Sequence, residues 1–441
     1  MLTLSARSRR GRADSSRVPG AVRSSIYLHI GEPKTGTTFL QQAMWSNRAR
    51  LAPQGVVLPG YSHRDHSRAS RDLREARRLA GDPADSWVGE WDVLTRQALR
   101  ASRATVISDE VLVACNPPQA DRAIRSLLPD DLQVVLTVRD IASLLPAEWQ
   151  ETVKCRGTIA WEQWLADVVD SASAADRRRR SWFWAVHDTL AILQMWSRHI
   201  PPDHVHVITV PRRGRPDALW ARFASVLEIE PGSIGVPSTR VNCSLGLEEA
   251  EFLRRMNEAL ADGMPEWFYT RNIKQVLAQN VLSARPPRSR LALPPAEQAW
   301  AAEQSEILVS ALRDSKYHIV GDLRDLLSPP ASGRRITPAP LPADQLLNAA
   351  VHAAAALADH HYEESRPAGR QPRQPRSPRQ RASKLEWAVL NGPWTRRMLR
   401  NASHLAAVRG LRVLIWCVLM HPARHRLGHA PVGDLDADID P

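Results

Sequence analysis

The stretch from residue 26 to residue 41, IYLHIGEPKTGTTFLQ, constrains the fold of this chain most. It begins with a short apolar run, Ile26 to Ile30, of the length expected for a buried β-strand. A turn built on Gly31, Pro33 and Gly36 follows, and threonines then stand where a helix should start. A strand, a glycine turn and a helix start in this order present backbone N–H groups and a positive helix end to an anion.

Two common nucleotide-binding loops do not fit this stretch. The loop of nucleoside triphosphatases places Lys directly after its last Gly, followed by a hydroxyl that holds Mg²⁺. Here Lys34 precedes Gly36 by two residues. The dinucleotide-binding pattern needs three glycines, and this turn has only Gly31 and Gly36.

The segment PKTGTTFL, residues 33–40, resembles the 5′-phosphosulfate loop of sulfotransferases that use 3′-phosphoadenosine 5′-phosphosulfate. That family's pattern is roughly P-K-[ST]-G-[TS]-[TS]-[WFL]-L after a strand. The resemblance implies that this molecule is the co-substrate, that no metal is needed, and that the loop binds the donor through Lys34, Thr35, Gly36, Thr37 and Thr38. A Lys at the loop tip can stabilise the bridging oxygen as the sulfonate leaves, while amides and hydroxyls hold the 5′-phosphate. The alternative is a capped helix after a turn, with an incidental Lys.

A second polar group follows the predicted strand 104–108, which ends in Asp109 and Glu110. Ligands of open α/β sheets lie at the carboxyl ends of the strands. In related carbohydrate sulfotransferases a Glu just after such a strand takes the proton of the acceptor hydroxyl, whereas the cytosolic type uses a His. The resemblance therefore points to Glu110 as the general base, with Asp109 or a His as alternatives. Equally, Asp109 or Glu110 caps the helix that follows.

Arg139 follows the clearest buried strand of the sequence, residues 132–138. An Arg at a strand's carboxyl end suits a phosphate, which its guanidinium can bind through two parallel hydrogen bonds. The resembling family places Arg there to grip the 3′-phosphate of the donor, with a Ser eight residues later. Ala147 stands at that eighth position here, so Ser143 is the candidate replacement. The alternative for Arg139 is an ion pair with a nearby carboxylate, Asp140 or Glu148.

Alternating strands and helices predict an α/β fold, a three-layer sandwich with a mostly parallel central sheet. The resemblance to the sulfotransferases spans about residues 25–328, which we expect to form one domain. We predict a disordered basic arm at 1–24, a Pro/Arg-rich linker with a short helix at 329–384, and a helical segment with an acidic tail at 385–441.

The net charge of +12 belongs to the ends of the chain. Residues 1–24 and 361–384 each carry +5 and residues 385–441 carry +2, so residues 25–360 are close to neutral. This distribution favours solvated tails over a nucleic-acid surface. The C-terminal segment 385–421, with arginines among apolar residues, is a candidate for peripheral membrane contact.

The four cysteines, Cys115, Cys155, Cys243 and Cys417, are widely spaced and form no C-x-x-C pair. This spacing argues against a zinc site or a disulfide framework and suits a reducing compartment. No secretory signal is visible and no apolar run reaches the ~18 residues of a membrane span. We therefore expect a cytoplasmic protein.

Three further patterns are predicted to be structural. The polar stretch 61–75 is interpreted as a solvated loop, with an acceptor site as the alternative, and the four-arginine run 177–180 as another solvated loop. The tryptophans between 158 and 199 are expected to pack in the core. The segment 242–246 is similar to a helix-opening stretch of bacterial sulfotransferases and serves equally as a simple helix cap.

The sequence thus predicts an enzyme that transfers a sulfonate to an acceptor hydroxyl, with a small molecule, a carbohydrate or a glycolipid as the candidate acceptor. A kinase or triphosphatase of similar topology and a non-catalytic scaffold with basic tails are the alternatives. The acceptor and the oligomeric state cannot be deduced from the sequence, because acceptor contacts come from loops that vary freely on one fold.

Overall fold

The computed structural model describes residues 25–75, 87–101, 104–128, 131–175, 177–212, 217–236, 244–260, 263–285, 291–328 and 341–365. The predicted basic arm at 1–24, the C-terminal segment at 385–441 and most of the linker lie outside the described residues.

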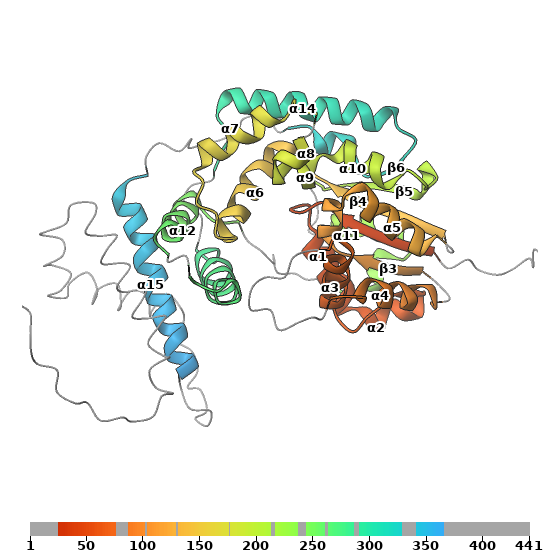
Figure 1. Ribbon diagram of the computed structural model, residues 1–441, viewed down its shortest axis with the longest axis horizontal. Coiled ribbons are helices and arrows are strands. Elements are labelled where there is room, and N and C mark those ends of the chain that lie inside the picture. The colour runs from red at the N-terminus through yellow and green to blue at the C-terminus, as the bar shows by residue number, and fades with distance from the viewer. Residues whose placement is uncertain are drawn as a thin grey trace, which may run out of the picture.

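A six-stranded sheet forms the centre of the molecule (Figure 1). Its strands are β1 Ser25–Gly31, β2 Val56–Val57, β3 Ala104–Ser108, β4 Asp131–Val138, β5 Val205–Thr209 and β6 His318–Val320. Their order is β2-β3-β1-β4-β5-β6, and every neighbouring pair is parallel. The predicted α/β class with a mostly parallel sheet is therefore confirmed.

Helices cover both faces of the sheet because successive side chains of each strand point to opposite faces. Ile26, Leu28 and Ile30 of β1 pack on one face. The helices that cover this face are α3 His63–Leu73, α4 Glu90–Leu99, α5 Pro117–Leu127, α10 Thr189–Trp196 and α14 Pro295–Asp314. Tyr27 packs on the other face, against α1 Thr37–Ser46 and α11 Ala218–Val226. The result is the predicted three-layer arrangement.

A second hydrophobic core, the helical core, lies beside the sheet and is built from helices (Figure 1). Its main elements are α6 Ile141–Lys154, α7 Trp161–Ser171, α9 Trp182–His187, α12 Leu247–Ala259, the π-helix η5 Tyr269–Leu282 and α15 Ala343–Ser365. The stacked pair Trp161 and Trp164 is buried here. Trp184 and Trp196 are also buried, so four of the five tryptophans between 158 and 199 pack in a core as predicted; the prediction is wrong for Trp182, which is 53% exposed.

Short elements connect these parts. They are α2 Arg48–Leu51, α8 Arg177–Arg180, α13 Glu266–Phe268, η1 Ala52–Gln54, η2 Glu110–Ala114, η3 Pro202–His204, η4 Pro231–Ser233 and η6 Leu323–Leu326. None of the helices in the described ranges is long and apolar enough to cross a membrane.

The helix α15 begins within the segment that the sequence predicts to be a linker. Its residues Ala349, Ala353 and Leu357 are buried in the helical core, where α15 packs on α12 and η5. The division of the chain into domains stays a prediction.

Two loop predictions are wrong. The stretch 61–75 forms the helix α3, which Ser62 caps together with Asp65 in a capping box. The buried face of α3 includes His66 and Ser70, so it lacks the apolar periodicity that predicts a helix. The four-arginine run forms the short helix α8, and Arg177 is held there by two hydrogen bonds to the Asp188 carboxylate, at 2.8 and 2.7 Å.

Candidate functional site

The loop after β1 lies between the carboxyl ends of two neighbouring strands. Since β1 pairs with β3 on one side and β4 on the other, residues 31–36 emerge between the ends of both. The backbone N–H of Glu32 donates to the carbonyl of Thr137 in β4 at 2.9 Å. The N–H of Asp109 donates to the carbonyl of His29 at 3.1 Å. The topology therefore brings the predicted loop, Glu110 and Arg139 to one edge of the sheet.

The loop itself has a tight backbone. Gly36 has a φ of 90° and precedes α1 as its N-cap residue, and Lys34 at the tip has a φ of 60°. Thr37 and Thr38 are the first two residues of α1, so their N–H groups belong to the first turn, which has no acceptors within the helix. The Thr35 hydroxyl points inward, donating to the Glu32 carbonyl at 2.5 Å and bonding to the Thr137 hydroxyl at 2.6 Å.

We predict that Gly36→Ala destabilises the protein by about 2–4 kcal/mol, because the left-handed backbone strains any L side chain and the new methyl overlaps another group. A Cβ at this position meets the side chain of Leu219 in α11. Gly89 is the matched control, since it has a φ of 84° and no atom within 4 Å of its Cβ position. Urea unfolding should show a smaller loss for Gly89→Ala; an equal loss in both variants contradicts the overlap with Leu219.

The ammonium group of Lys34 forms an ion pair with Glu151 of α6. Two more lysines reach the same carboxylate. Lys154 Nζ lies 3.3 Å from Glu151 Oε2, and Lys274 Nζ of η5 lies 2.8 Å from Oε1. We call these four residues the lysine cluster. Burial alone raises the pKa of Glu151, but the charges of Lys34, Lys154 and Lys274 outweigh it and hold that pKa well below its usual range.

Glu110 and Asp109 have different surroundings. Asp109 is buried and caps η2: its Oδ2 accepts from the Ser67 hydroxyl at 2.6 Å and its Oδ1 accepts from the N–H of Val111 at 3.0 Å. Burial, reinforced by the charge of Glu110, raises the pKa of Asp109 to about 6. Glu110 is half-buried and accepts from Gln41 Nε2 of α1 at 3.0 Å. Asp109 is therefore the cap of η2, whereas the Glu110 side chain contacts Gln41 of α1 and is partly open to solvent.

Gly31 allows the backbone carrying Glu110 to approach the loop. A Cβ on Gly31 stands only 3.0 Å from Glu110 Cα.

His29 and His66 of the same region are fully buried, and burial lowers the pKa of His29 to about 3 and that of His66 to about 4.

Arg139 follows β4 directly and lies beside the loop. Its Nη1 donates to the carbonyl oxygen of Lys34 at 3.4 Å, and within the described ranges the guanidinium makes no ion pair with Asp140 or Glu148. Asp140 instead caps α6 by accepting the N–H of Ser143 at 2.9 Å. Ser143 thus stands in the first turn of α6, which begins two residues after Arg139.

A buried chain of charged residues contacts the loop after β1 through Glu32. The imidazole of His187 lies between two carboxylates, with Nδ1 3.1 Å from Glu32 Oε2 and Nε2 3.6 Å from Glu148 Oε2. The Thr189 hydroxyl donates to Glu32 Oε1 at 2.6 Å, and Trp182 Nε1 donates to Glu148 Oε1 at 3.2 Å. Burial alone lowers the pKa of His187, but Glu148 and Glu32 raise it to about 9, so the imidazole is protonated at neutral pH.

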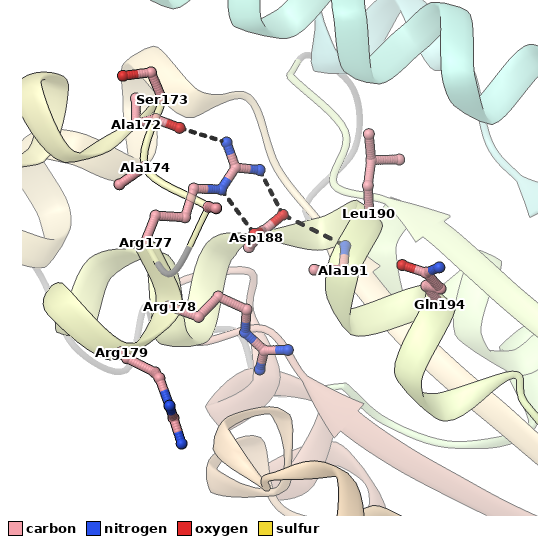
Figure 2. Close-up of a pocket in the computed structure, with 11 residues that line it drawn as sticks. Ala172, Ser173, Ala174, Arg177, Arg178, Arg179, Asp188, Leu190, Ala191 and Gln194 are labelled. Carbon is pink, nitrogen blue, oxygen red and sulfur yellow. Dashed lines mark hydrogen bonds and ion pairs between the residues drawn. The ribbon is translucent and has the colours of Figure 1, made fainter.

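A separate cavity of about 590 Å³ lies among the loop after α7, α8 and α10 (Figure 2). Arg177 and Asp188, which are hydrogen-bonded to each other, form part of its wall, and Arg178 and Arg179 extend along its lower side in that view. None of the residues predicted for the site lines this cavity.

Sequence analysis did not find the partners of Lys34. Glu151, Lys154 and Lys274 are polar residues on helices, without a local motif. The ion pair between Lys34 and Glu151 spans 117 residues of sequence, and Lys154 and Lys274 reach the site through the same carboxylate. The signal that was available is the rarity of lysine: only five of the 59 Lys and Arg residues of the chain are lysines.

No protein-family model matches this chain, and no curated protein matches it. A solved structure that is similar is described as a sulfotransferase from Alicyclobacillus acidocaldarius. It has 16% sequence identity, and the match covers 52% of this chain and 91% of that one with a TM-score of 0.32. At this level of similarity we draw nothing about the activity of the chain from the match.

Proposed function

We propose that this protein transfers a sulfonate group from 3′-phosphoadenosine 5′-phosphosulfate to the hydroxyl group of an acceptor. The observation that carries the proposal is the ammonium of Lys34, which stands at the tip of a strand–turn–helix loop and already holds the carboxylate of Glu151. An ammonium that binds a carboxylate in this position can bind an oxygen of a phosphosulfate instead.

The residues around the loop fit a donor with two phosphate groups. The N–H groups of Gly36, Thr37 and Thr38 at the start of α1 suit the 5′-phosphate. Arg139, which makes no ion pair within the described ranges, suits the 3′-phosphate, with Ser143 one turn into α6. Within the described residues no group of His, Cys, Asp and Glu is placed to hold a metal ion, and the proposed donor loop uses an ammonium and backbone amides.

The reaction breaks the bond between the sulfonate sulfur and the bridging oxygen of the 5′-phosphate and forms a bond between that sulfur and the acceptor oxygen. Lys34 stabilises the charge that develops on the departing oxygen. Glu110 accepts the proton of the acceptor hydroxyl as the new bond forms, and Gln41 holds the Glu110 carboxylate in place. A carbohydrate or a glycolipid is the acceptor class we propose.

The direct test is binding and turnover. We expect adenosine 3′,5′-bisphosphate to bind in calorimetry, and mass spectrometry of cell extract incubated with the protein and isotopically labelled donor to show one labelled, sulfonated product. If adenosine 3′,5′-bisphosphate gives no heat of binding, the result supports the non-catalytic scaffold instead. Mg²⁺-dependent turnover of ATP supports a kinase or triphosphatase.

We predict that Glu110→Gln lowers the rate of transfer by about 10²–10⁴-fold, the usual contribution of a general base. Because the amide keeps the size of the side chain, the affinity for adenosine 3′,5′-bisphosphate should stay within about twofold. The matched control is Glu90→Gln at the start of α4, whose carboxylate is 27% exposed and lies 3.6 Å from Arg68. A Glu110→Gln protein that keeps full activity removes Glu110 from the mechanism and leaves the acceptor proton to another group.

A further inference from the structure

Three of the five lysines of this chain meet at one carboxylate. The chain uses arginine nearly everywhere else, since arginines make up all but five of its 59 basic residues. Lys34, Lys154 and Lys274 come from the loop, from α6 and from η5, so that no local repeat brings them together. An ammonium is a compact charge with three rotatable donors, whereas a guanidinium has a rigid planar fork. The choice of lysine thus favours a ligand with oxygens in several directions.

The lysine cluster has more positive than negative charge. Glu151 is the only carboxylate among its four members, and the neighbouring Glu148 on the same helix is already engaged by His187 and Trp182. The side chain of Lys154 is only 7% exposed. Burial lowers the pKa of Lys154, and the charge of Lys34 lowers it further, while Glu151 opposes both. Lys34 also interacts electrostatically with Glu148, and the Glu32–His187–Glu148 group has one net negative charge, so this group offsets part of the excess of two positive charges. The partly buried positive charge that remains is unfavourable unless an anion neutralises it.

Solvent nevertheless reaches the cluster. The side chains of Lys34, Glu151 and Lys274 are 23%, 24% and 25% exposed. An anion can therefore arrive without unfolding of the surrounding helices. The carboxylate of Glu151 occupies the position that the lysines would otherwise offer to a ligand.

We propose that Lys34, Lys154 and Lys274 form a subsite for a tetrahedral oxyanion, and that Glu151 is an internal counter-ion that this oxyanion displaces. The ligand class is a sulfonate, or a sulfate or phosphate group. Its source rests on the proposed function: it is either the sulfonate of the donor or an anionic group on the acceptor. Lys154 and Lys274 are in both cases binding residues additional to the loop.

The subsite is tested by measuring the binding of inorganic sulfate to the full chain without nucleotide, using calorimetry at low ionic strength. We expect Lys274→Gln to weaken sulfate binding about 10-fold, because one of three ammonium groups is lost. We expect Glu151→Gln to strengthen it about 10-fold, because the competing carboxylate is gone. Lys316→Gln, an exposed lysine just before β6, is the control and should leave the affinity unchanged.

Changes of opposite sign in the sulfate affinity of Glu151→Gln and Lys274→Gln are what an internal counter-ion predicts. A purely structural role for the cluster predicts that Glu151→Gln and Lys274→Gln both lower the melting temperature and leave sulfate affinity alone. Equal sulfate affinity in the wild type and Lys274→Gln, or weaker binding by Glu151→Gln, overturns the proposal. Both residues are partly exposed, and circular dichroism of each variant verifies that it folds.

The source of the oxyanion is then resolved with the nucleotides. If Lys274→Gln weakens binding of the intact donor and not of adenosine 3′,5′-bisphosphate, the subsite holds the sulfonate that is transferred. If it weakens neither, while sulfate binding in the presence of saturating bisphosphate is lost, the subsite holds an anionic acceptor. Sulfate binding at the cluster without binding of either nucleotide keeps the subsite and rejects the proposed function.

Discussion

Lys34→Ala should abolish sulfonate transfer while leaving the fold intact. The ammonium of Lys34 is the charged group at the loop tip, and loss of one such donor to a developing oxyanion typically lowers the rate by about 10²–10³-fold. We expect at least that loss here, because Lys34 also contributes to the charge of the lysine cluster. The measurement is the initial rate of product formation from labelled donor at saturating concentrations.

The design of this variant separates chemistry from folding. Alanine keeps the Cβ, so the backbone strain at a φ of 60° is the same as in the wild type. Glu151 keeps Lys154 and Lys274 as partners, at 3.3 and 2.8 Å, so no buried carboxylate is left uncompensated. The melting temperature should therefore change by less than about 2 °C. Lys316→Ala is the control for loss of a lysine, and full activity of Lys34→Ala refutes the catalytic role.

His187→Gln should produce the largest loss of stability among single substitutions near the site. It removes the positive charge between Glu32 and Glu148, both of which are buried. Breaking a buried ion pair from one side costs about 3–5 kcal/mol, because the remaining charges are uncompensated. Urea unfolding at pH 7 measures the loss, and His199→Gln on the surface, where the imidazole is 53% exposed, is the matched control.

The pH dependence of the same contact has a defined sign. The pKa of His187 in the folded protein is about 9, above the 6.5 of an unperturbed histidine. The stabilisation by its protonated form is thus fully present below pH 6.5 and is lost as the pH rises through about 9. The difference in unfolding free energy between wild type and His187→Gln, on the order of 3 kcal/mol, should shrink between pH 6.5 and pH 10. A difference that stays constant over this range shows that His187 acts through packing alone.

The local part of the site was predictable from the sequence. The strand β1, its glycine turn and the start of α1 are consecutive residues whose preferences agree, so the loop at residues 31–38 follows from short-range rules. The end of β4 at Arg139 was predictable for the same reason. Their convergence also follows, since parallel strands place their carboxyl ends at one edge of a sheet.

The long-range part was not predictable. Glu151, Lys154 and Lys274 look like ordinary surface residues of helices, and only tertiary packing brings η5 next to α6. His187 also lacks a local signal, because its two carboxylates come from the loop after β1 and from α6. The helix α3 was missed because it buries His66 and Ser70 in place of apolar residues. Charge pairs across the fold leave no periodic pattern in a single sequence.

The position of Lys34 between the two hydrophobic cores limits which substitutions can improve this protein during evolution. Lys34 lies in the loop that follows β1 of the sheet, while Glu151 and Lys154 belong to α6 and Lys274 to η5, two helices of the helical core. The same charges therefore lie at the junction of the two halves of the molecule and form the proposed binding site. A substitution that strengthens the ion pairs of this junction would also make the Glu151 carboxylate a stronger competitor of the ligand. Greater stability of the protein and faster turnover are therefore in conflict at Glu151.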